Sequence, residues 1–354
     1  VGALAGDPTM DGAALGKVIC DAYYAGCQAV GTQDNTTLSL TDLSKAGKLL
    51  EAYETFGAEA LAAVCDDPGF FSGFGRAAAQ SENYGGNTKE QGYTNMVDLG
   101  HMARQNKDVL PSAQNVLDAL EECVLYRVNG KYRAEATGLS CYYSYNGDLD
   151  DLNGYINVGA GTAFKYFFAY ELTGTLDETG MAYLESMNID VLPEVKSLAA
   201  TDWDGKALEV DEQGVSSLTL GKEAEEILAG IGFALYYVDE ENDALMFLGT
   251  DNDMNADWEH GVFSDNFRNV WGSIDGHLVY MELSFEGEDY NLYSIPVLLN
   301  GDAYGLQVVY DFTAEQWSIL GARQGINESG MADKELRQLQ EGDQLTTLWY
   351  FASA

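Results

Sequence analysis

The segment Asn83–His101, which reads NYGGNTKEQGYTNMVDLGH, is the part of the chain around which the rest can be interpreted. Its double glycine at 85–86 is typical of a turn. From Thr94 onward, apolar residues recur at helical spacing, and Thr94 or Asn95 can cap the helix that this spacing predicts. The segment ends at His101, the only histidine in the first two-thirds of the chain. The sequence therefore raises the question of whether His101 takes part in chemistry.

The composition indicates a globular protein with a strong negative charge. The chain has 354 residues, of which 46% are hydrophobic and 12% aromatic, enough for two domains with substantial cores. Its 57 acidic and 18 basic residues give a formal net charge of −39, which attracts basic peptides and divalent cations. The same charge repels nucleic acid, and no apolar run approaches the roughly 20 residues that span a bilayer, so neither nucleic acid nor membrane insertion is predicted. Since the acids are spread along the chain, plain solubility is the alternative explanation of the charge.

Apolar periodicity divides the chain into a mixed α/β part and a β-rich part. Helical spacing predicts helices over 10–31, 41–64, 68–77, 94–102, 112–123 and 162–172, and alternation predicts strands over 124–128 and 137–145. After residue 176, short strand-like runs separated by Asp, Asn and Gly turns dominate. The sequence therefore predicts a first domain over residues 1–180 and a β-rich, sandwich or barrel-like domain over residues 181–354.

The cysteines include one candidate nucleophile. Five cysteines are an odd number, and without a C-x-x-C pair they argue against a disulfide scaffold and a structural zinc site. Most of them lie on apolar helix faces, where a thiol packs as a small hydrophobic group. Cys141, within the run Gly-Leu-Ser-Cys-Tyr-Tyr, is the one near residues typical of a site. A Cys141–His101 dyad is the lowest-ranked hypothesis, and it requires the two side chains to lie within hydrogen-bond reach.

Two oxygen-rich runs are weak candidates for calcium sites. The first supplies carboxylate or amide oxygens at alternating positions, as an EF-hand loop does. These candidate ligands are Asp251, Asp253, Asn255 and Asp257. However, Ala256 replaces the glycine of that loop, and Val262 stands where its bidentate glutamate would be. The second run, at 148–154, is interrupted by Leu152, so an ordinary polar turn is the alternative for both.

Several short motifs follow one another along the first half of the chain. They are Thr37-Leu38-Ser39-Leu40-Thr41-Asp42-Leu43-Ser44; Ala78, Gln80 and Tyr84-Gly85; Tyr93 with Asn95-Met96-Val97-Asp98-Leu99; and Ala136 with Gly138-Leu139-Ser140 and Tyr142-Tyr143. Their order and spacing resemble those of clostripain-like cysteine peptidases, which belong to the caspase–gingipain–legumain clan. The resemblance covers about residues 1–175 and is faint beyond them.

This resemblance implies a caspase-like α/β domain that cleaves peptide bonds after Arg or Lys with a His–Cys dyad, often with the help of calcium. It also implies a bacterial protein that is secreted or held at the cell surface. The strand around residue 140 corresponds to the one that runs beside the substrate in such enzymes. The candidate cleft residues are therefore Gly138, Leu139, Ser140, Cys141 and Tyr142.

The dyad itself has no match in this chain. In the family, a His-Gly turn and then an Asp-Ala-Cys turn precede the motif at 37–44. Here the Asp-Ala pair at 21–22 is followed by Tyr23, and the His-Gly pair at 260–261 lies far downstream with no cysteine after it. The resemblance therefore implies that the dyad lies before Val1 and that no residue of this chain is catalytic. This carboxy-terminal portion is expected to be inactive without the amino-terminal part of the peptidase as its partner.

A second hypothesis, from another class, is a non-catalytic surface protein that binds peptide, glycan or calcium on a degenerate peptidase scaffold. The acidic, tyrosine-rich second half would form that binding surface. A His-Gly turn followed by Asp-Ala-Cys in the preceding part of the gene would favour the peptidase, and the absence of both would favour the binding protein.

Overall fold

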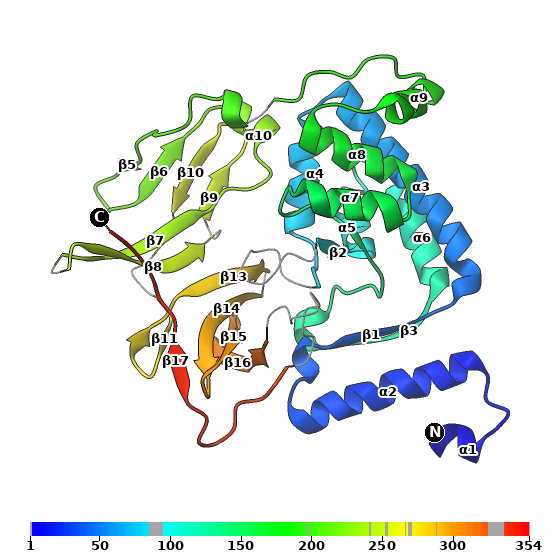
Figure 1. Ribbon diagram of the computed structural model, residues 1–354, viewed down its shortest axis with the longest axis horizontal. Helices are drawn as coiled ribbons and strands as arrows, with labels where there is room; N and C mark the ends of the chain where they lie inside the picture. The colour runs from blue at the N-terminus through cyan, green and yellow to red at the C-terminus, as the bar shows by residue number, and fades with distance from the viewer. Residues whose placement is uncertain are drawn as a thin grey trace. The chain divides into compact units, whose positions relative to one another are not determined.

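The chain divides into two compact units, one that ends at Val195 and one that begins at Lys196 (Figure 1). The computed structural model describes residues 2–84, 95–196, 198–240, 242–251, 254–265, 267, 271–287, 289–324 and 336–353. The first unit contains helices and small sheets, and the second consists mainly of strands. The prediction of a mixed α/β part followed by a β-rich part is confirmed at this level.

The first unit combines helices with two pairs of short strands. Its helices are α1 (Gly2–Gly6), α2 (Gly12–Val30), α3 (Ala46–Asp66), α4 (Phe70–Ala79), α5 (Leu99–Asn106), α6 (Ala113–Cys123), α7 (Leu149–Val158), α8 (Thr162–Thr173) and α9 (Glu178–Ser186), with 3-10 turns η1 (Gln33–Asn35), η2 (Leu43–Lys45) and η3 (Lys131–Arg133). Its strands are β1 (Thr37–Thr41), β2 (Met96–Asp98), β3 (Val124–Asn129) and β4 (Ser140–Tyr142).

Helix α3 forms much of the core of this unit because its long apolar stripe contacts several other helices. Phe56 on α3 is buried, and its ring centroid lies 5.4 Å from that of Phe164 on α8 and 6.2 Å from that of Phe74 on α4. Aromatic pairs at these distances stabilise a core beyond the burial of their area. Gly57 is needed beside this contact, since a Cβ there would lie 2.7 Å from the Phe164 ring.

Two glutamates of α3 cap the neighbouring helices. Glu54 accepts hydrogen bonds from the Thr162 and Ala163 amides at the start of α8, at 2.5 and 3.0 Å. Glu59 accepts one from the Ser112 amide, just before α6, at 2.8 Å. A carboxylate at a helix N-terminus satisfies free N–H groups and interacts favourably with the helix dipole. Polar side chains of the central helix therefore help to fix where α6 and α8 begin.

The strands of the first unit form two separate antiparallel ladders. β1 pairs with β3 from Thr37 opposite Asn129 onward, and β2 pairs with β4. Helix α2 lies along the β1–β3 ladder (Figure 1). Gly16 allows this approach, because a Cβ there would lie 2.3 Å from Leu40 Cδ1. Within the described residues, the two ladders do not join into the single sheet that the caspase-like resemblance implies.

The segment after residue 94 begins as a strand, so the prediction of one helix over 94–102 is wrong. β2 forms because it pairs with β4, and α5 begins only after it. Asp98 caps α5 by accepting a hydrogen bond from the His101 amide at 2.8 Å. Asn95 is not the cap, and Thr94 and the predicted turn at 85–86 lie outside the described residues. The helix predicted over 41–64 likewise begins later, because residue 41 ends β1.

The second unit is dominated by one large sheet. Eight strands join in the order β16-β15-β14-β13-β8-β18, with β17 beside β14 and β7 beside β8, and a four-stranded sheet has the order β5-β6-β10-β9. The strands are β5 (Glu209–Val210), β6 (Ser216–Thr219), β7 (Phe233–Asp239), β8 (Ala244–Asp251), β9 (Met254–Asp257), β10 (Val262–Asp265), β11 (Ser273–Ile274), β12 (His277–Leu278), β13 (Met281–Glu286), β14 (Tyr290–Leu299), β15 (Asp302–Asp311), β16 (Gln316–Arg323), β17 (Leu345–Thr347) and β18 (Tyr350–Ser353). The helical turns are η4 (Leu198–Ala200) and α10 (Glu223–Ile227).

The core of the second unit lies on the middle strands of the large sheet. Val297 and Leu299 of β14 are buried together with Leu306 and Val308 of β15. These residues alternate along their strands, as expected where one face of a sheet is buried. The alternation that predicted strands after residue 176 therefore corresponds to real burial.

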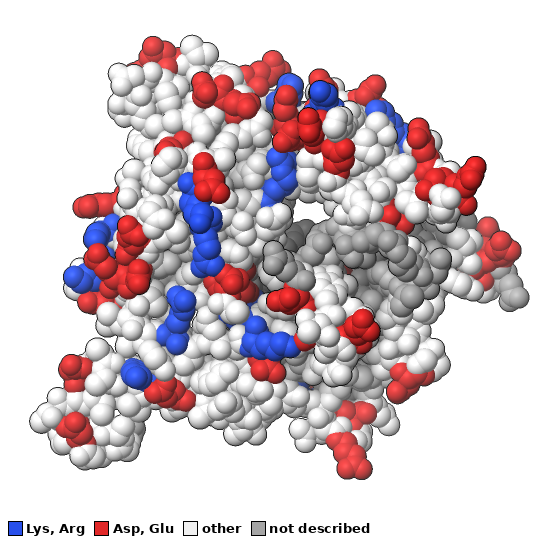
Figure 2. Space-filling view, turned by 180° about the vertical axis from the view of Figure 1, so that it is seen from behind, with Lys and Arg blue, Asp and Glu red and all other residues white. Residues whose placement is uncertain are grey.

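Acidic side chains are widely spread over the surface. On the face shown in Figure 2, Asp and Glu side chains lie at many separate places and do not gather into one patch. This distribution agrees with the spread of acids along the sequence. Among the helices of the described residues, none combines the length and the apolar character needed to cross a membrane.

Candidate functional site

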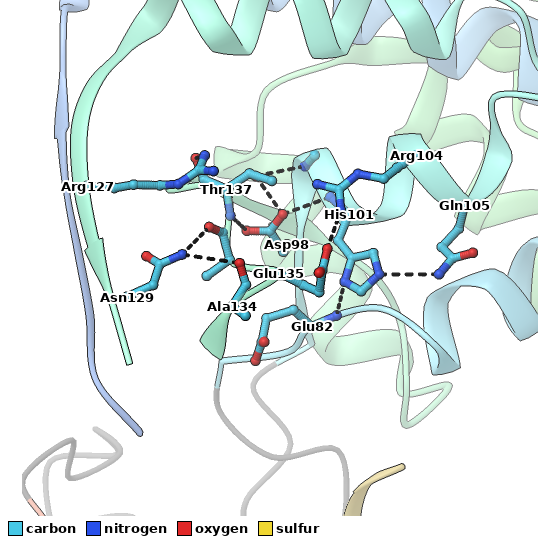
Figure 3. Close-up of polar contacts among 12 residues, drawn as sticks. Glu82, Asp98, His101, Arg104, Gln105, Arg127, Asn129, Ala134, Glu135 and Thr137 are labelled. Carbon is cyan, nitrogen blue, oxygen red and sulfur yellow. Dashed lines mark hydrogen bonds and ion pairs between the residues drawn. The ribbon is translucent and has the colours of Figure 1, made fainter. Parts of the chain in front are cut away.

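A buried carboxylate, Asp98, organises the surroundings of the candidate cleft (Figure 3). Its side chain is fully buried at the end of β2. It accepts hydrogen bonds from the Thr137 amide and hydroxyl at 2.7 and 2.5 Å, from the His101 amide at 2.8 Å and from the Tyr84 hydroxyl at 2.5 Å. A buried charge is strongly destabilising unless it is hydrogen-bonded, and these donors meet that need. Asp98 therefore joins β2, α5 and the segment that leads into β4.

The chain just before β4 is also held by the β1–β3 ladder. Asn129 of β3 donates a hydrogen bond to the Ala136 carbonyl at 2.8 Å, and Ser39 of β1 donates one to the Gly138 carbonyl at 2.6 Å. Gly138 has a φ of +108°, and a Cβ there would lie 3.0 Å from Ser39 Cβ. Glycine is required at this position both for its backbone conformation and for the close approach of β1.

The five candidate cleft residues, 138–142, form one continuous segment in which Ser140 is exposed and the other four are half-buried. The Leu139 carbonyl accepts a hydrogen bond from the Leu99 amide at 2.9 Å, and Ser140 at the start of β4 is exposed. In the described part of the chain, β4 pairs with β2 on one edge only. An open strand edge offers its free N–H and C=O groups to an extended peptide. The outer edge of β4 is therefore unpaired by any described strand.

The thiol of Cys141 is unsuited to nucleophilic attack. Burial raises the pKa of Cys141 to about 12, so the thiol stays protonated at neutral pH, whereas the thiolate is the reactive form. Burial likewise raises the pKa of Cys65 to about 11, and it raises the pKa values of Cys20 and Cys123. These four thiols behave as packing groups.

His101 supports the fold. Its Nδ1 accepts a hydrogen bond from the Glu82 amide at 3.1 Å, and its Nε2 lies 3.2 Å from the Gln105 side-chain amide (Figure 3). Since Nδ1 is an acceptor, the neutral ring carries its proton on Nε2, and the Gln105 amide accepts it when it turns its oxygen toward the ring. Burial lowers the pKa of His101, which favours this neutral form. Both ring nitrogens contact groups other than the Cys141 thiol, so the Cys141–His101 dyad is not assembled.

A buried ion pair lies beside His101. Glu82 is 1% exposed and pairs with Arg133, which also donates to the Asn83 carbonyl at 3.0 Å. Burial raises the pKa of Glu82, and the positive charge of Arg133 opposes that rise. The two residues lie 51 positions apart, so no local pattern in the sequence predicts their pairing.

Sequence reasoning missed a group of buried polar atoms next to β4. Glu171 Oε2 is buried and has no hydrogen-bond partner among the described residues, and the buried hydroxyls of Tyr142 and Ser144 lie near each other. The Tyr142 ring centroid lies 5.2 Å from that of Phe168, which is one turn before Glu171 on α8. Burial raises the pKa of Glu171 to about 8. The one available signal was a lone acid in the aromatic run KYFFAYEL of α8.

The described candidate calcium ligands lie on strands, with Asp251 at the end of β8 and Asn255 and Asp257 on β9, unlike the loop between two helices of an EF-hand. Asp253 and the side chain of Asp251 lie outside the described residues. Asn255 and Asp257 are exposed on β9, and Asp257 Oδ2 lies 2.9 Å from His260 Nδ1. Within the part of the chain that the structure describes, no three His, Cys, Asp or Glu side chains converge to hold a metal ion.

Comparisons with known proteins gave no relative for this chain. A scan against models of protein families, a search of curated proteins and a search of solved structures each found no match.

Proposed function

We propose that the first unit is the scaffold and substrate-facing portion of a clostripain-like cysteine endopeptidase that cleaves after Arg or Lys. In this proposal the His–Cys dyad is supplied by a separate segment, the amino-terminal part of the peptidase, which docks on the first unit and completes its caspase-like sheet. The proposal includes a bacterial protein that is secreted or held at the cell surface, a setting that the net charge of −39 suits.

The observation that carries this proposal is the incomplete β1–β3 ladder. In the described part of the chain, each of its strands pairs on one edge only. Isolated two-stranded ladders are marginally stable, and layered α/β domains bury the apolar faces of their helices. Here α2 leaves Ile19 55% and Val30 59% exposed, and Tyr23 and Leu125 of β3 are exposed as well. A segment that adds strands to this ladder would cover these side chains.

The candidate cleft supports the same proposal. The outer edge of β4, which no described strand pairs with, can hold an extended peptide, and the acidic surface attracts basic substrates. The raised pKa values of Cys65 and Cys141 and the engaged ring of His101 leave these groups unsuited to attack on a peptide bond. In this proposal the docked segment therefore supplies the groups that attack the peptide bond, and residues 138–142 position the substrate peptide.

Hydrolysis of fluorogenic peptides with Arg or Lys before the scissile bond tests the proposal, with and without calcium. The complete gene product is expected to cleave both peptides and to lose activity after treatment with iodoacetamide. The 354-residue chain alone is expected to be inactive. An inactive complete gene product would overturn the proposal. So would activity of the 354-residue chain that disappears in Cys141→Ala.

A matched pair of variants of the complete gene product tests the docking face. Ile19→Glu places a charge on the exposed face of α2 and is expected to lower activity about tenfold, equivalent to about 1.4 kcal/mol of docking free energy. Val158→Glu makes the same kind of apolar-to-charged change at the end of α7, where the valine is 87% exposed, and is expected to leave activity unchanged. Equal effects of the two variants would contradict docking at α2.

A further inference from the structure

The two edge strands of the large sheet in the second unit, β16 and β7, differ in how their outer edges are covered. On the β16 side, Ala322 pairs with Arg337, and Gln338 donates a side-chain hydrogen bond to the Leu320 carbonyl, so the segment at 336–338 covers part of that strand. On the other side, β7 pairs with β8 over the whole of residues 233–239, and no described strand pairs with its outer edge. Proteins usually protect such edges, because bare N–H and C=O groups recruit further strands.

β7 carries little of what usually protects an edge strand. Its sequence, FALYYVD, contains no Lys, Arg or Pro, its one charged residue is the terminal Asp239, and its register against β8 shifts once, between Leu235 and Tyr236. Tyr236, Tyr237 and Val238 are consecutive and all exposed, so apolar side chains are accessible on both faces of the strand. A long, apolar and uncovered edge is a surface that proteins use to bind an extended segment.

Aromatic rows extend this surface across the neighbouring strands. Tyr236 of β7 lies opposite Phe247 of β8, with ring centroids 5.0 Å apart, and Phe247 lies opposite Tyr350 of β18. On the other face, Tyr237 lies opposite Met246, and Met246 lies opposite Phe351. An added strand would therefore find aromatic rings beside its own side chains on both faces of the sheet.

We infer that β7 is a docking strand for an extended basic segment of another protein. Acidic residues follow β7 directly, with Asp239 at its end and exposed Glu240 and Asp243 in the turn to β8. Lys or Arg side chains of a docked strand would meet these carboxylates and could also lie over the exposed tyrosine rings. A second copy of this chain is the wrong occupant, since each copy carries a charge of −39 and repels the other.

The docking strand does not depend on the proposed peptidase role, because it lies in the second unit and uses only backbone pairing, aromatic contact and charge. A fluorescein-labelled peptide, Lys-Val-Thr-Val-Lys-Val-Thr-Lys, tests it by fluorescence anisotropy with the full chain. This peptide is expected to bind, and its counterpart with Glu in place of Lys is expected to bind about tenfold more weakly. Amide hydrogen exchange of β7 is expected to slow when the basic peptide binds, as new strand pairing protects its N–H groups.

Two valine substitutions give a matched control. Val238→Lys on β7, where the valine is 59% exposed, is expected to lower the affinity for the basic peptide about tenfold through charge repulsion. Val210→Lys, at a 65% exposed valine on β5 of the other sheet, is expected to leave the affinity unchanged. Equal affinity of wild type and Val238→Lys, or unchanged exchange in β7, would overturn the inference. A dimer without peptide that Val238→Lys dissociates would show that a second copy occupies the strand, which also overturns it.

Discussion

Asp98 and Glu171 both place carboxylate oxygens in the interior of the first unit, but the hydrogen-bond donors around them differ. Asp98 accepts hydrogen bonds from two backbone amides and two hydroxyl groups. Among the described residues Glu171 Oε2 is buried and has no hydrogen-bond partner, and burial raises the pKa of Glu171 to about 8. Burial alone therefore does not decide the role of a carboxyl group in this fold. The hydrogen-bond donors around it matter as well: Asp98, which has four, joins separate elements, whereas Glu171 keeps its proton at neutral pH.

The largest expected effect comes from Asp98→Asn. The amide has the size of the carboxylate, but its NH2 group must face a donor, and the remaining bonds lose the charge that strengthens them. We expect α5 and the segment before β4 to lose about 3 kcal/mol of stability. Amide hydrogen exchange of α5 measures this loss directly.

Asp108→Asn is the matched control for this substitution. Asp108 follows α5, and its side chain is exposed, so the same chemical change should alter exchange in α5 very little. Equal exchange in wild type and Asp98→Asn would show that the hydrogen bonds of Asp98 contribute nothing to the junction.

An intermediate effect is expected from Glu171→Gln, and it depends on pH. The folded carboxyl has a pKa of about 8 against an ordinary value of 4.5, so the folded state holds the proton more tightly than the unfolded state. Stability is therefore full below about pH 4.5 and is lost as the pH rises through 8. Because Gln does not titrate, the variant should be more stable than wild type above this range and match it most closely at low pH.

Amide exchange of α8, measured over this pH range and corrected for intrinsic exchange rates, follows the difference between wild type and Glu171→Gln. Glu185→Gln, at an exposed glutamate of α9, is the control and should parallel wild type at every pH. If Glu171→Gln also paralleled wild type, the carboxyl of Glu171 would have hydrogen-bond partners like that of Asp98, and the contrast between the two would disappear.

The smallest effect is expected from Tyr84→Phe. This change removes one of the donors to Asp98 and leaves the other three in place. A single hydrogen bond to a carboxylate that keeps other donors is worth about 1 kcal/mol, so exchange in α5 should accelerate far less than in Asp98→Asn. A loss as large as that in Asp98→Asn would mean that the tyrosine hydroxyl, and not the set of donors, stabilises the junction.

The sequence predicted the helices whose apolar stripes are long, and it failed where pairing with a distant strand decided the conformation. The helix predicted over 10–31 is α2, and it begins after Asp11, whose side chain caps it by accepting a hydrogen bond from the Ala14 amide at 2.7 Å. α7 was not predicted, because its acidic start at 148–151 was interpreted as a polar turn or calcium loop. In the structure Asp148 caps that helix by accepting from the Asp150 and Asp151 amides.

The candidate site shows the same division. Residues 138–142 could be proposed from the sequence because they are contiguous and match a motif. The hydrogen bonds that position this segment could not be predicted from the sequence. Thr137 bonds to Asp98 across 39 positions, and Ser39 bonds to Gly138 across 99. Long-range hydrogen bonds leave no periodic trace in the sequence, because the partners need only be polar and need not recur at any spacing.

The sequence by itself determined the mixed α/β and β-rich halves, the acidic surface and the approximate course of most helices and strands. These depend on composition and on apolar periods of 3.6 and 2, which are local properties. Only the tertiary structure decided that the segment after residue 94 starts as a strand, that His101 supports the fold, and that Asp98 and Glu171 differ. Each of these depends on which groups from distant segments lie within hydrogen-bond reach, and that is settled by packing.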